Sequence, residues 1–267
     1  MDKTVEQLER TGIIPVVVLD DAKDALPLAK ALCEGGLPAA EITFRTAAAR
    51  ESIAVIASEC PDMVVGAGTV LTCKQADEAF AAGAKFIVAP GLNPEVVGHC
   101  RELGVPMLPG CSSATDIEAA LALGLTEVKF FPAEQLGGLR MIKALAAPYT
   151  GVRFMPTGGL NAGNIAPYLE ERCIIACGGS FMVSRELIAG GEFERIRSMS
   201  EKASSLMCRM TFKETAPDGK AVFTCPSPMR TVFQLERRGV RFIPGTEVFR
   251  DGRLVSAETG TMRITAV

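Results

Sequence analysis

The strongest constraint on the fold of this chain is a regular alternation that runs from Gly12 to about Ser204. Short runs of β-branched and aliphatic residues end in Gly, Pro or Thr, and Ala- and Leu-rich stretches with helical spacing follow them. The runs that we expect to be strands are Ile14–Leu19, Ala39–Phe44, Val64–Thr69, Phe86–Ala89, Pro106–Pro109, Glu127–Phe131, Arg153–Thr157 and Ile174–Cys177. Eight strands alternating with helices over roughly 190 residues predict an α/β fold, a (β/α)8 TIM barrel with short connections.

A doubly wound open sheet is the alternative architecture for the same alternation. Its usual nucleotide-binding signature, GxGxxG after the first strand, is absent, because the first strand leads into "LDDAKDA". The expected helices include "DAKDALPLAKALCEGG", "TCKQADEAFAAGA" and "SATDIEAALALG", and each of these stretches reaches a glycine. We therefore favour the barrel.

The pattern changes after residue 204, so we predict two domains, a barrel over 1–204 and a small α+β module over 205–267. We expect strands in "CRMTFKE", "AVFTC", around "VRFIP", in "TEVFRDGRLVSAE" and in "TMRITAV", and a helix in "SPMRTVFQLERRG". The tetrapeptide "RDGR", Arg250 to Arg253, is a hairpin-turn signal.

Composition excludes several classes of function. The net charge is −3 and the 28 Lys and Arg are dispersed, which argues against nucleic-acid and membrane partners. Nine cysteines without a CxxC pair and a polar segment at Met1–Arg10 indicate a reduced, cytoplasmic protein. The single histidine, His99, excludes a histidine-rich metal site, and we expect it on a helix surface.

Ionisable side chains are expected inside the barrel. Alternation along "AEITFRT" places Glu41, Thr43 and Arg45 on one face, and the apolar Ile42 and Phe44 suit the helix-facing side. Lys129, in the apolar context "EVKFFPAE", adds an ammonium group to the interior, with Glu127 and Phe131 on the same face by parity. A buried ion-pair network that only closes the barrel is the structural alternative.

Two glycine-rich turns follow the last two expected barrel strands. "TGGLNAGN" contributes Gly158 and Gly159, and "CGGSFMV" contributes Gly178, Gly179 and the hydroxyl of Ser180. At this position in a barrel, backbone N–H groups bind phosphate, so the turns predict a phosphorylated ligand without naming a reaction.

Together these residues suggest an amine nucleophile acting on a 2-oxo acid. Apolar neighbours and the charge of Arg45 should favour the neutral amine of Lys129, which would form a Schiff base, with Glu41 moving protons. Arg45 can bind the substrate carboxylate, and Thr69 and Thr157 can donate hydrogen bonds. A phosphate-binding isomerase, epimerase or synthase and a noncatalytic trimeric scaffold remain the alternatives.

Seven segments carry a resemblance to a known family: "EITFRT", "VGAGTVL", "APGLNPEV", "LPGCSS", "EVKFFPAE", "PTGGLNAGN" and "CGGSFMV". Over about residues 5–200 the chain resembles the class I 2-dehydro-3-deoxy-6-phosphogluconate (KDPG) aldolases, which include 4-hydroxy-2-oxoglutarate aldolases. The resemblance implies a metal-free homotrimer without cofactor that yields pyruvate and glyceraldehyde 3-phosphate.

The roles that the resemblance implies are Schiff-base formation for Lys129, acid–base catalysis for Glu41, and binding of the pyruvate carboxylate by Arg45 and Thr69. It also implies that the pocket is lined by Phe131 and Thr157, with the phosphate at Gly158, Gly159, Gly179 and Ser180.

The departures from the family concern the pocket rim and the tail. "GCSS" and "SFMV" differ from the usual pattern, which leaves open the choice between the phosphorylated six-carbon substrate, its C4 epimer and 4-hydroxy-2-oxoglutarate. Residues 208–267 resemble half of a glyoxalase-type βαβββ module. Because the tail has one copy and no histidine, we expect it to be noncatalytic and either to pair with another chain's tail or to cover the barrel.

Overall fold

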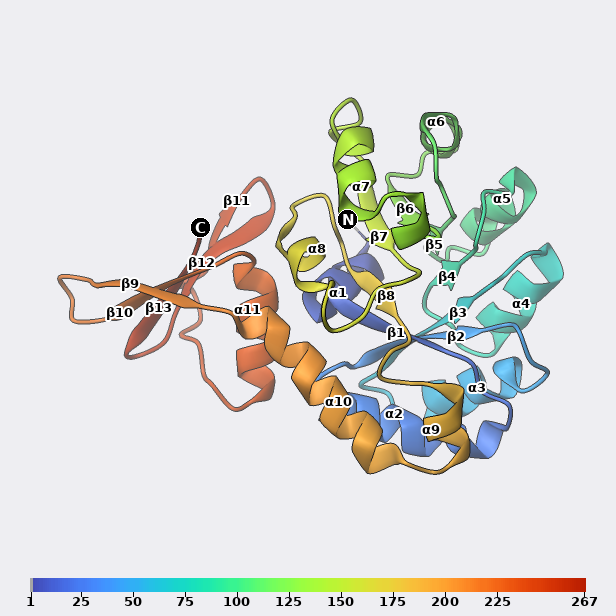
Figure 1. Ribbon diagram of the computed structural model, residues 1–267, viewed down its shortest axis with the longest axis horizontal. Helices are drawn as coiled ribbons and strands as arrows, with labels where there is room; N and C mark the ends of the chain where they lie inside the picture. The colour runs from blue at the N-terminus through green and yellow to red at the C-terminus, as the bar shows by residue number, and fades with distance from the viewer. Residues whose placement is uncertain (1) are drawn as a thin grey trace.

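The structure, a computed structural model, describes residues 2–267 and contains an eight-stranded parallel barrel (Figure 1). The barrel strands are β1 (Ile13–Val17), β2 (Ala39–Thr43), β3 (Val64–Gly68), β4 (Ile87–Val88), β5 (Met107–Leu108), β6 (Glu127–Phe130), β7 (Arg153–Pro156) and β8 (Cys177–Gly179). Six form a curled sheet in the order β5-β4-β3-β2-β1-β8, and β6 pairs with β7. Bridges between Gly110 and Lys129 and between Thr157 and Gly178 connect the two parts. The (β/α)8 prediction is confirmed.

Helices surround the strands in the alternation expected from the sequence. They are α1 (Lys3–Thr11), α2 (Ala25–Glu34), α3 (Ala49–Glu59), α4 (Cys73–Ala81), α5 (Pro94–Glu102), α6 (Ala114–Ala122), α7 (Gly138–Ala146), α8 (Ala166–Glu170), α9 (Arg185–Ala189) and α10 (Phe193–Ser205). Short 3-10 turns lie at Ala22–Asp24, Glu134–Leu136 and Leu206–Cys208. Local signals set the helix starts: Ser113 and Asp116 form a capping box at α6, and Asn93 caps α5 directly before Pro94.

The barrel has two apolar layers. One lies between the strands and the surrounding helices, and the other fills the barrel interior. The interior layer includes Phe86, Met155 and Leu8, and Leu8 belongs to α1 rather than to a strand. Helix α1 therefore contributes to the apolar filling of the barrel, which leaves the opposite, carboxyl ends of the strands for a binding site.

The eighth strand differs from its expected position at Ile174–Cys177. Ile174 makes only an isolated bridge with Phe154, and the regular strand is Cys177–Gly179, where Gly178 pairs with Ile14. The physical reason lies in the tail. The guanidinium of Arg230 donates hydrogen bonds to the carbonyl oxygens of Ile174 and Ile175, so these carbonyls bond to a side chain instead of to a neighbouring strand. The second glycine pair is thereby part of the strand instead of a loop after it.

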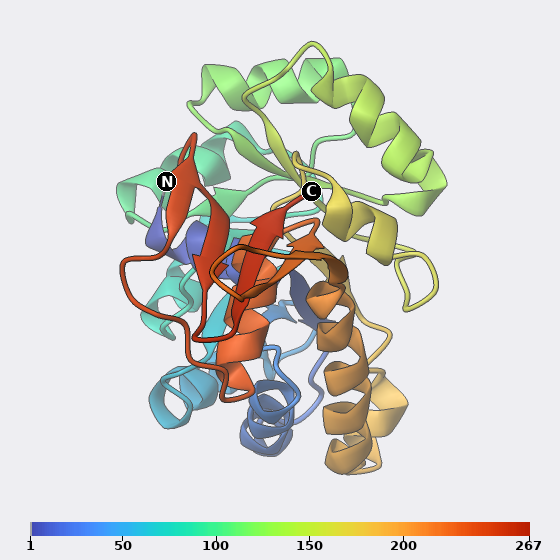
Figure 2. The ribbon, with the colours of Figure 1, turned by 90° about the vertical axis from the view of Figure 1, so that its left-hand side faces the viewer.

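The tail is a separate α+β module with its own sheet, as predicted (Figure 2). Its elements are β9 (Thr211–Thr215), β10 (Ala221–Cys225), α11 (Pro228–Arg237), β11 (Val248–Arg250), β12 (Arg253–Glu258) and β13 (Met262–Ala266), with the sheet order β11-β12-β13-β10-β9. The hairpin at "RDGR" is confirmed, with Asp251 and Gly252 at positive φ of 51° and 74°. The strand expected around Val240–Pro244 was wrong. That segment has one backbone bond to the sheet, from Ile243 N to Glu258 O, and Pro244 has no N–H to add another.

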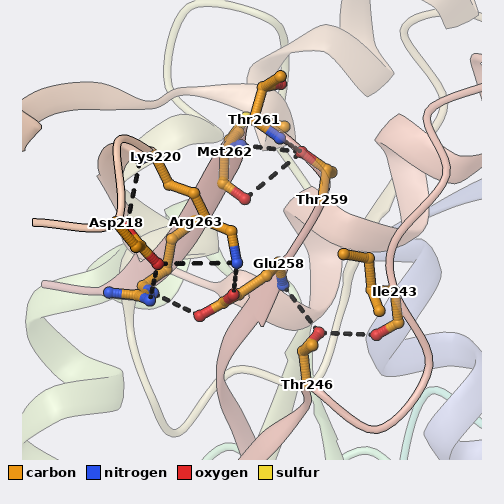
Figure 3. A network of polar contacts seen from close by, with 9 residues as sticks. All are labelled: Asp218, Lys220, Ile243, Thr246, Glu258, Thr259, Thr261, Met262 and Arg263. Carbon is orange, nitrogen blue, oxygen red and sulfur yellow. Dashed lines mark hydrogen bonds and ion pairs between the residues drawn. The ribbon is translucent and has the colours of Figure 1, made fainter. Parts of the chain in front are cut away.

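Charged side chains tie the turns of this module together (Figure 3). Glu258 accepts hydrogen bonds from Lys220 and from Arg263 Nε, the latter at 2.5 Å, and Arg263 also donates to Asp218 at 3.1 Å. The two cations and two anions balance, and Glu258 is 17% exposed. This network therefore fastens β12, β13 and the turn before β10, and its residues are already satisfied by one another.

Arg230 of α11 joins the module to the amino-terminal side of the barrel. Its side chain is 4% exposed and donates to the carbonyl oxygens of Glu9, Leu169, Ile174 and Ile175 at 2.5 to 3.1 Å. Gln234 adds a bond to Gly36 O at 2.9 Å. In Figure 1 this helix lies between the barrel and the tail sheet. Among residues 2–267, no helix combines the length and the apolar character needed to cross a membrane.

Candidate active site

Lys129 and Glu41 meet inside the barrel. Lys129 comes from β6 and is 4% exposed, whereas Glu41 comes from β2 and is fully buried. The distance from Lys129 Nζ to Glu41 Oε1 is 3.3 Å, and the Phe131 ring centroid lies 5.2 Å from the same Nζ. Strand alternation explains the encounter, because both side chains point to the barrel interior from strands on opposite sides of the barrel. The amine is therefore held out of water, beside a proton acceptor.

The other two carboxylates near Lys129 in the sequence have different partners. Glu127 accepts from Arg153 Nη2 at 2.8 Å, and the hydroxyl of Tyr168 donates to Glu134. Strand alternation predicted Glu127 as a partner of Lys129, but Glu127 does not contact it. Glu127 instead pairs with Arg153, which also binds Glu9, at the amino-terminal end of the barrel. Glu41 is the carboxylate paired with the buried amine.

Arg45 and Thr69 form the second pair of predicted residues that the structure brings together. Arg45 Nε donates to Thr69 Oγ1 at 3.3 Å across the carboxyl ends of β2 and β3. Thr69 has a φ of +57°, which is uncommon for a β-branched residue and costs conformational energy. Thr43, from the same polar trio as Glu41 and Arg45, instead donates to Val17 O at 2.8 Å and stays structural.

Two glycines make room for these side chains. A Cβ on Gly68 would lie 2.1 Å from Glu41 Oε1, and a Cβ on Gly178 would lie 2.3 Å from Thr157 Oγ1. Neither contact is possible without displacing the functional group. Gly68 was not predicted as a site residue, and the signal that could have found it is its place in "GAGT", on the strand next to that of Glu41 and directly before Thr69.

Four buried side-chain polar atoms have no hydrogen-bond partner among the residues that the structure describes, and two of them, Glu41 Oε2 and Thr157 Oγ1, belong to predicted site residues; the other two are Ser52 Oγ and Ser200 Oγ. The sequence predicts Glu41 to face the barrel interior and Thr157 to line the pocket. Buried polar atoms in native proteins are nearly always satisfied, so atoms left open beside a pocket point to a bound molecule or water. The polar groups are thus arranged to receive a ligand.

A cavity of about 440 Å³ opens beside these groups. Predicted residues that line it are Arg45, Phe131, Thr157, Gly158, Gly159, Gly179 and Ser180; further lining residues are Val16, Val18, Leu160, Gly178, Val183, Ser184 and Arg185. Lys129, Glu41 and Thr69 do not line it, but two residues that do are in contact with them: Phe131 with Lys129, and Arg45 with Thr69. Arg185 was not predicted as a site residue, because it is the first residue of an ordinary helix, α9, after the N-cap Ser184.

Other reactive side chains do not belong to this cavity. Burial raises the pKa of the Cys111 thiol to about 12, so it is protonated at neutral pH. His99 lies on α5, and its Nε2 contacts Asp77 Oδ1 at 2.7 Å. Among residues 2–267, no group of three or more His, Cys, Asp or Glu side chains is placed to hold a metal ion.

Comparison with known proteins shows which family this barrel belongs to. The family model described as "KDPG and KHG aldolase" matches residues 4–199. The chain belongs to this aldolase family. A 2-dehydro-3-deoxy-phosphogluconate aldolase of Treponema pallidum is 53% identical over 202 residues, which cover 76% of this chain and 96% of the relative.

Two further members of the aldolase family extend the comparison. The KHG/KDPG aldolase of Escherichia coli K12 is 38% identical over 75% of this chain and 94% of its own length. The solved KDPG aldolase of Legionella pneumophila, "with pyruvate captured at low pH as a covalent carbinolamine intermediate", has a TM-score of 0.72 and 34% identity, covering 75% of this chain and 97% of that one. The family match ends at residue 199, so the tail lies outside it.

Proposed function

We propose that this protein is a class I aldolase that cleaves 2-dehydro-3-deoxy-6-phosphogluconate to pyruvate and glyceraldehyde 3-phosphate. The observation that carries the proposal is the contact of 3.3 Å between the buried amine of Lys129 and the carboxylate of Glu41. A pair of this kind supplies both requirements of the reaction, a nucleophilic nitrogen and a group that moves protons. The names of the relatives and the pyruvate carbinolamine in the Legionella enzyme support the same chemistry.

The reaction begins at Lys129. One proton leaves the amine, for which Glu41 is the nearest acceptor, and the neutral nitrogen attacks C2 of the substrate to form a carbinolamine. Glu41 returns a proton to the departing hydroxyl, water leaves, and an iminium remains between Nζ and C2. The iminium withdraws electrons from C3, which prepares the C3–C4 bond for cleavage.

Cleavage and release again use Glu41. The carboxylate takes the proton of the C4 hydroxyl, the C3–C4 bond breaks, and its electron pair forms an enamine while glyceraldehyde 3-phosphate leaves. Glu41 then protonates the enamine at C3, and water hydrolyses the resulting iminium to pyruvate and free Lys129. The unpaired Glu41 Oε2 is an available acceptor for the C4 proton.

The remaining predicted residues bind the substrate. We assign the pyruvate carboxylate to Arg45 and Thr69, because a guanidinium and a hydroxyl suit a carboxylate and the two are already in contact at 3.3 Å. Phe131 and Thr157 line the cavity above Lys129. Gly158, Gly159, Gly179 and Ser180 form the side that we assign to the phosphate, because these backbone positions leave room for close approach.

A direct test measures pyruvate release from three substrates: the phosphorylated sugar acid, its C4 epimer and 4-hydroxy-2-oxoglutarate. We expect the highest kcat/KM with 2-dehydro-3-deoxy-6-phosphogluconate. A clear preference for 4-hydroxy-2-oxoglutarate would favour the alternative, in which the same mechanism acts on a shorter substrate. The name of the Escherichia coli relative, KHG/KDPG aldolase, includes both kinds of substrate. No release from any of them would favour the noncatalytic scaffold.

For the assembly we propose two domains, 1–204 and 205–267, in a cytoplasmic homotrimer without cofactor or metal. The tail's order β10-α11-β11-β12-β13, with β10 parallel to β13, supports its likeness to half of a glyoxalase-type module. Its ionic network is self-contained, so we assign it a structural role, covering the amino-terminal side of the barrel. Native mass spectrometry should give three chains per particle, and Glu258→Gln should leave kcat unchanged.

A further inference from the structure

A second arginine lies on the cavity, away from Arg45. Arg45 and Arg185 are the charged side chains among the described residues that line it. They belong to different sides, because Arg45 follows β2 and contacts Thr69, whereas Arg185 follows β8 and comes five positions after Ser180. Arg185 therefore shares its side of the cavity with the second glycine pair.

Asp20 holds Arg185 in place. The guanidinium donates from Nε to Asp20 Oδ2 at 3.1 Å and from Nη2 to Oδ1, so two parallel bonds fix its plane. Asp20 lies just beyond β1, the strand that pairs with β8, so the contact spans neighbouring strand ends. The hydrogen bond from Arg185 lowers the pKa of the Asp20 carboxyl, which keeps the carboxylate charged at neutral pH.

This arrangement leaves part of the guanidinium open. A guanidinium has five N–H groups, and Asp20 occupies those on Nε and one on Nη2. The two on Nη1 and the second on Nη2 face no acceptor among the residues that the structure describes. The open edge has the fork geometry that binds phosphate and carboxylate oxygens, and the side chains of the pair are 56% and 59% exposed, so a ligand can reach it.

We propose that Arg185, oriented by Asp20, is the residue that makes the enzyme prefer a substrate with a terminal phosphate over one without it. The first glycine turn and the end of β8 offer N–H dipoles only, and Arg185 adds a full positive charge at the same end of the cavity. The inference rests on the proposed aldolase function and deepens it, because it names the specificity determinant of that site.

The test compares two substrates on four proteins. Arg185→Met removes the charge, and Asp20→Asn removes the anchor while keeping its size. Arg195→Met is the matched control, since Arg195 pairs with Glu192 at the surface of α10 and does not line the cavity. The kcat/KM is measured for 2-dehydro-3-deoxy-6-phosphogluconate and for its unphosphorylated counterpart, together with the inhibition constant of inorganic phosphate.

We expect Arg185→Met to lower kcat/KM for the phosphorylated substrate by about 10-fold, mainly through KM, because one exposed charge-assisted contact is lost. The value for the unphosphorylated substrate should change by less than about 2-fold, and phosphate should inhibit the variant more weakly. Asp20→Asn should give a smaller loss of the same selectivity, and the effect should shrink at high ionic strength.

An equal loss on both substrates, or no loss on either, would overturn the proposal. These outcomes are distinct from failure of the proposed function. If the wild-type protein cleaves neither substrate and gives no borohydride adduct with pyruvate, the aldolase assignment itself is wrong. A Schiff-base adduct that forms equally in wild type and Arg185→Met shows that the reaction centre is intact in the variant.

Discussion

Lys129 Nζ lies 3.3 Å from Glu41 Oε1, although 88 residues separate the two in the chain. Glu41 is fully buried and its second oxygen, Oε2, has no hydrogen-bond partner among the described residues. A stability network alone would satisfy both oxygens, since a half-satisfied buried carboxylate is costly. The relationship supports our proposal that Lys129 is a nucleophile and Glu41 its acid–base partner, with the other oxygen open to a substrate.

Replacing Lys129 by Arg should abolish aldol cleavage and leave the fold intact. Arginine keeps the positive charge beside Glu41, but its guanidinium does not form a Schiff base, so we expect kcat to fall by more than about 10³-fold. Pyruvate release measures activity, and circular dichroism reports folding. Activity within about 10-fold of wild type would contradict the nucleophilic role of Lys129.

Replacing Glu41 by Gln should slow the reaction without removing the nucleophile. The amide keeps the size of the side chain but does not accept protons, so we expect kcat to fall by about 10²–10⁴-fold. Borohydride should still trap a pyruvate adduct in this variant, more slowly than in wild type. A variant that retains full kcat would assign the proton transfers to another group.

Adding a methyl group at Gly178 should impair the site, because the new Cβ would lie 2.3 Å from Thr157 Oγ1. We expect Gly178→Ala to lower stability by about 1–3 kcal/mol through overpacking and to lower kcat/KM. Gly98→Ala is the matched control: this glycine lies inside helix α5 with open space around its Cβ position. That change should raise stability by about 0.5–1 kcal/mol and leave activity unchanged. Equal effects at both positions would argue against close packing at Gly178.

Arg230 should contribute strongly to stability. Truncation in Arg230→Ala leaves four backbone carbonyls without their donor, so we expect a loss of at least about 2 kcal/mol in the free energy of unfolding. Hydrogen exchange should rise around Ile174 and in α11. The exposed Arg241 supplies a control whose change to Ala should cost little. Equal stabilities of the two variants would show that the tail does not depend on Arg230.

Stability should fall in alkaline solution because of buried thiols. Burial raises the pKa of Cys111 and Cys177 from 9.0 to about 12. Below pH 9 these thiols are protonated in both folded and unfolded chains; above it, the unfolded chain releases protons that the folded chain keeps, so rising pH favours unfolding. Each thiol should lower the free energy of unfolding by about 1.4 kcal/mol per pH unit between pH 9 and 12. Denaturant titrations at pH 8 and 10.5 measure this loss, and an unchanged loss in Cys177→Ala would contradict the contribution of that thiol.

The sequence predicted the parts of the molecule that depend on local pattern. The strand–helix alternation established the barrel, and parity along "AEITFRT" and "EVKFFPAE" placed Glu41 and Lys129 inside it, whereas Arg45 lies beyond the end of β2 and is exposed. What it missed depends on long-range contacts. Arg230 donates hydrogen bonds to the carbonyl oxygens of Ile174 and Ile175, and the last strand is Cys177–Gly179. Likewise, the pairing of Arg185 with Asp20 joins residues 165 positions apart and leaves no local signal.

The central claim, that Lys129 forms a Schiff base, is tested most directly by trapping it. The protein is incubated with pyruvate and sodium borohydride, the intact mass is measured, and the modified peptide is mapped. We predict one reduced pyruvate adduct per chain, on Lys129, and none in Lys129→Arg. The absence of an adduct on every lysine, under conditions in which the protein remains folded, would contradict the class I mechanism and leave the buried amine with a structural role.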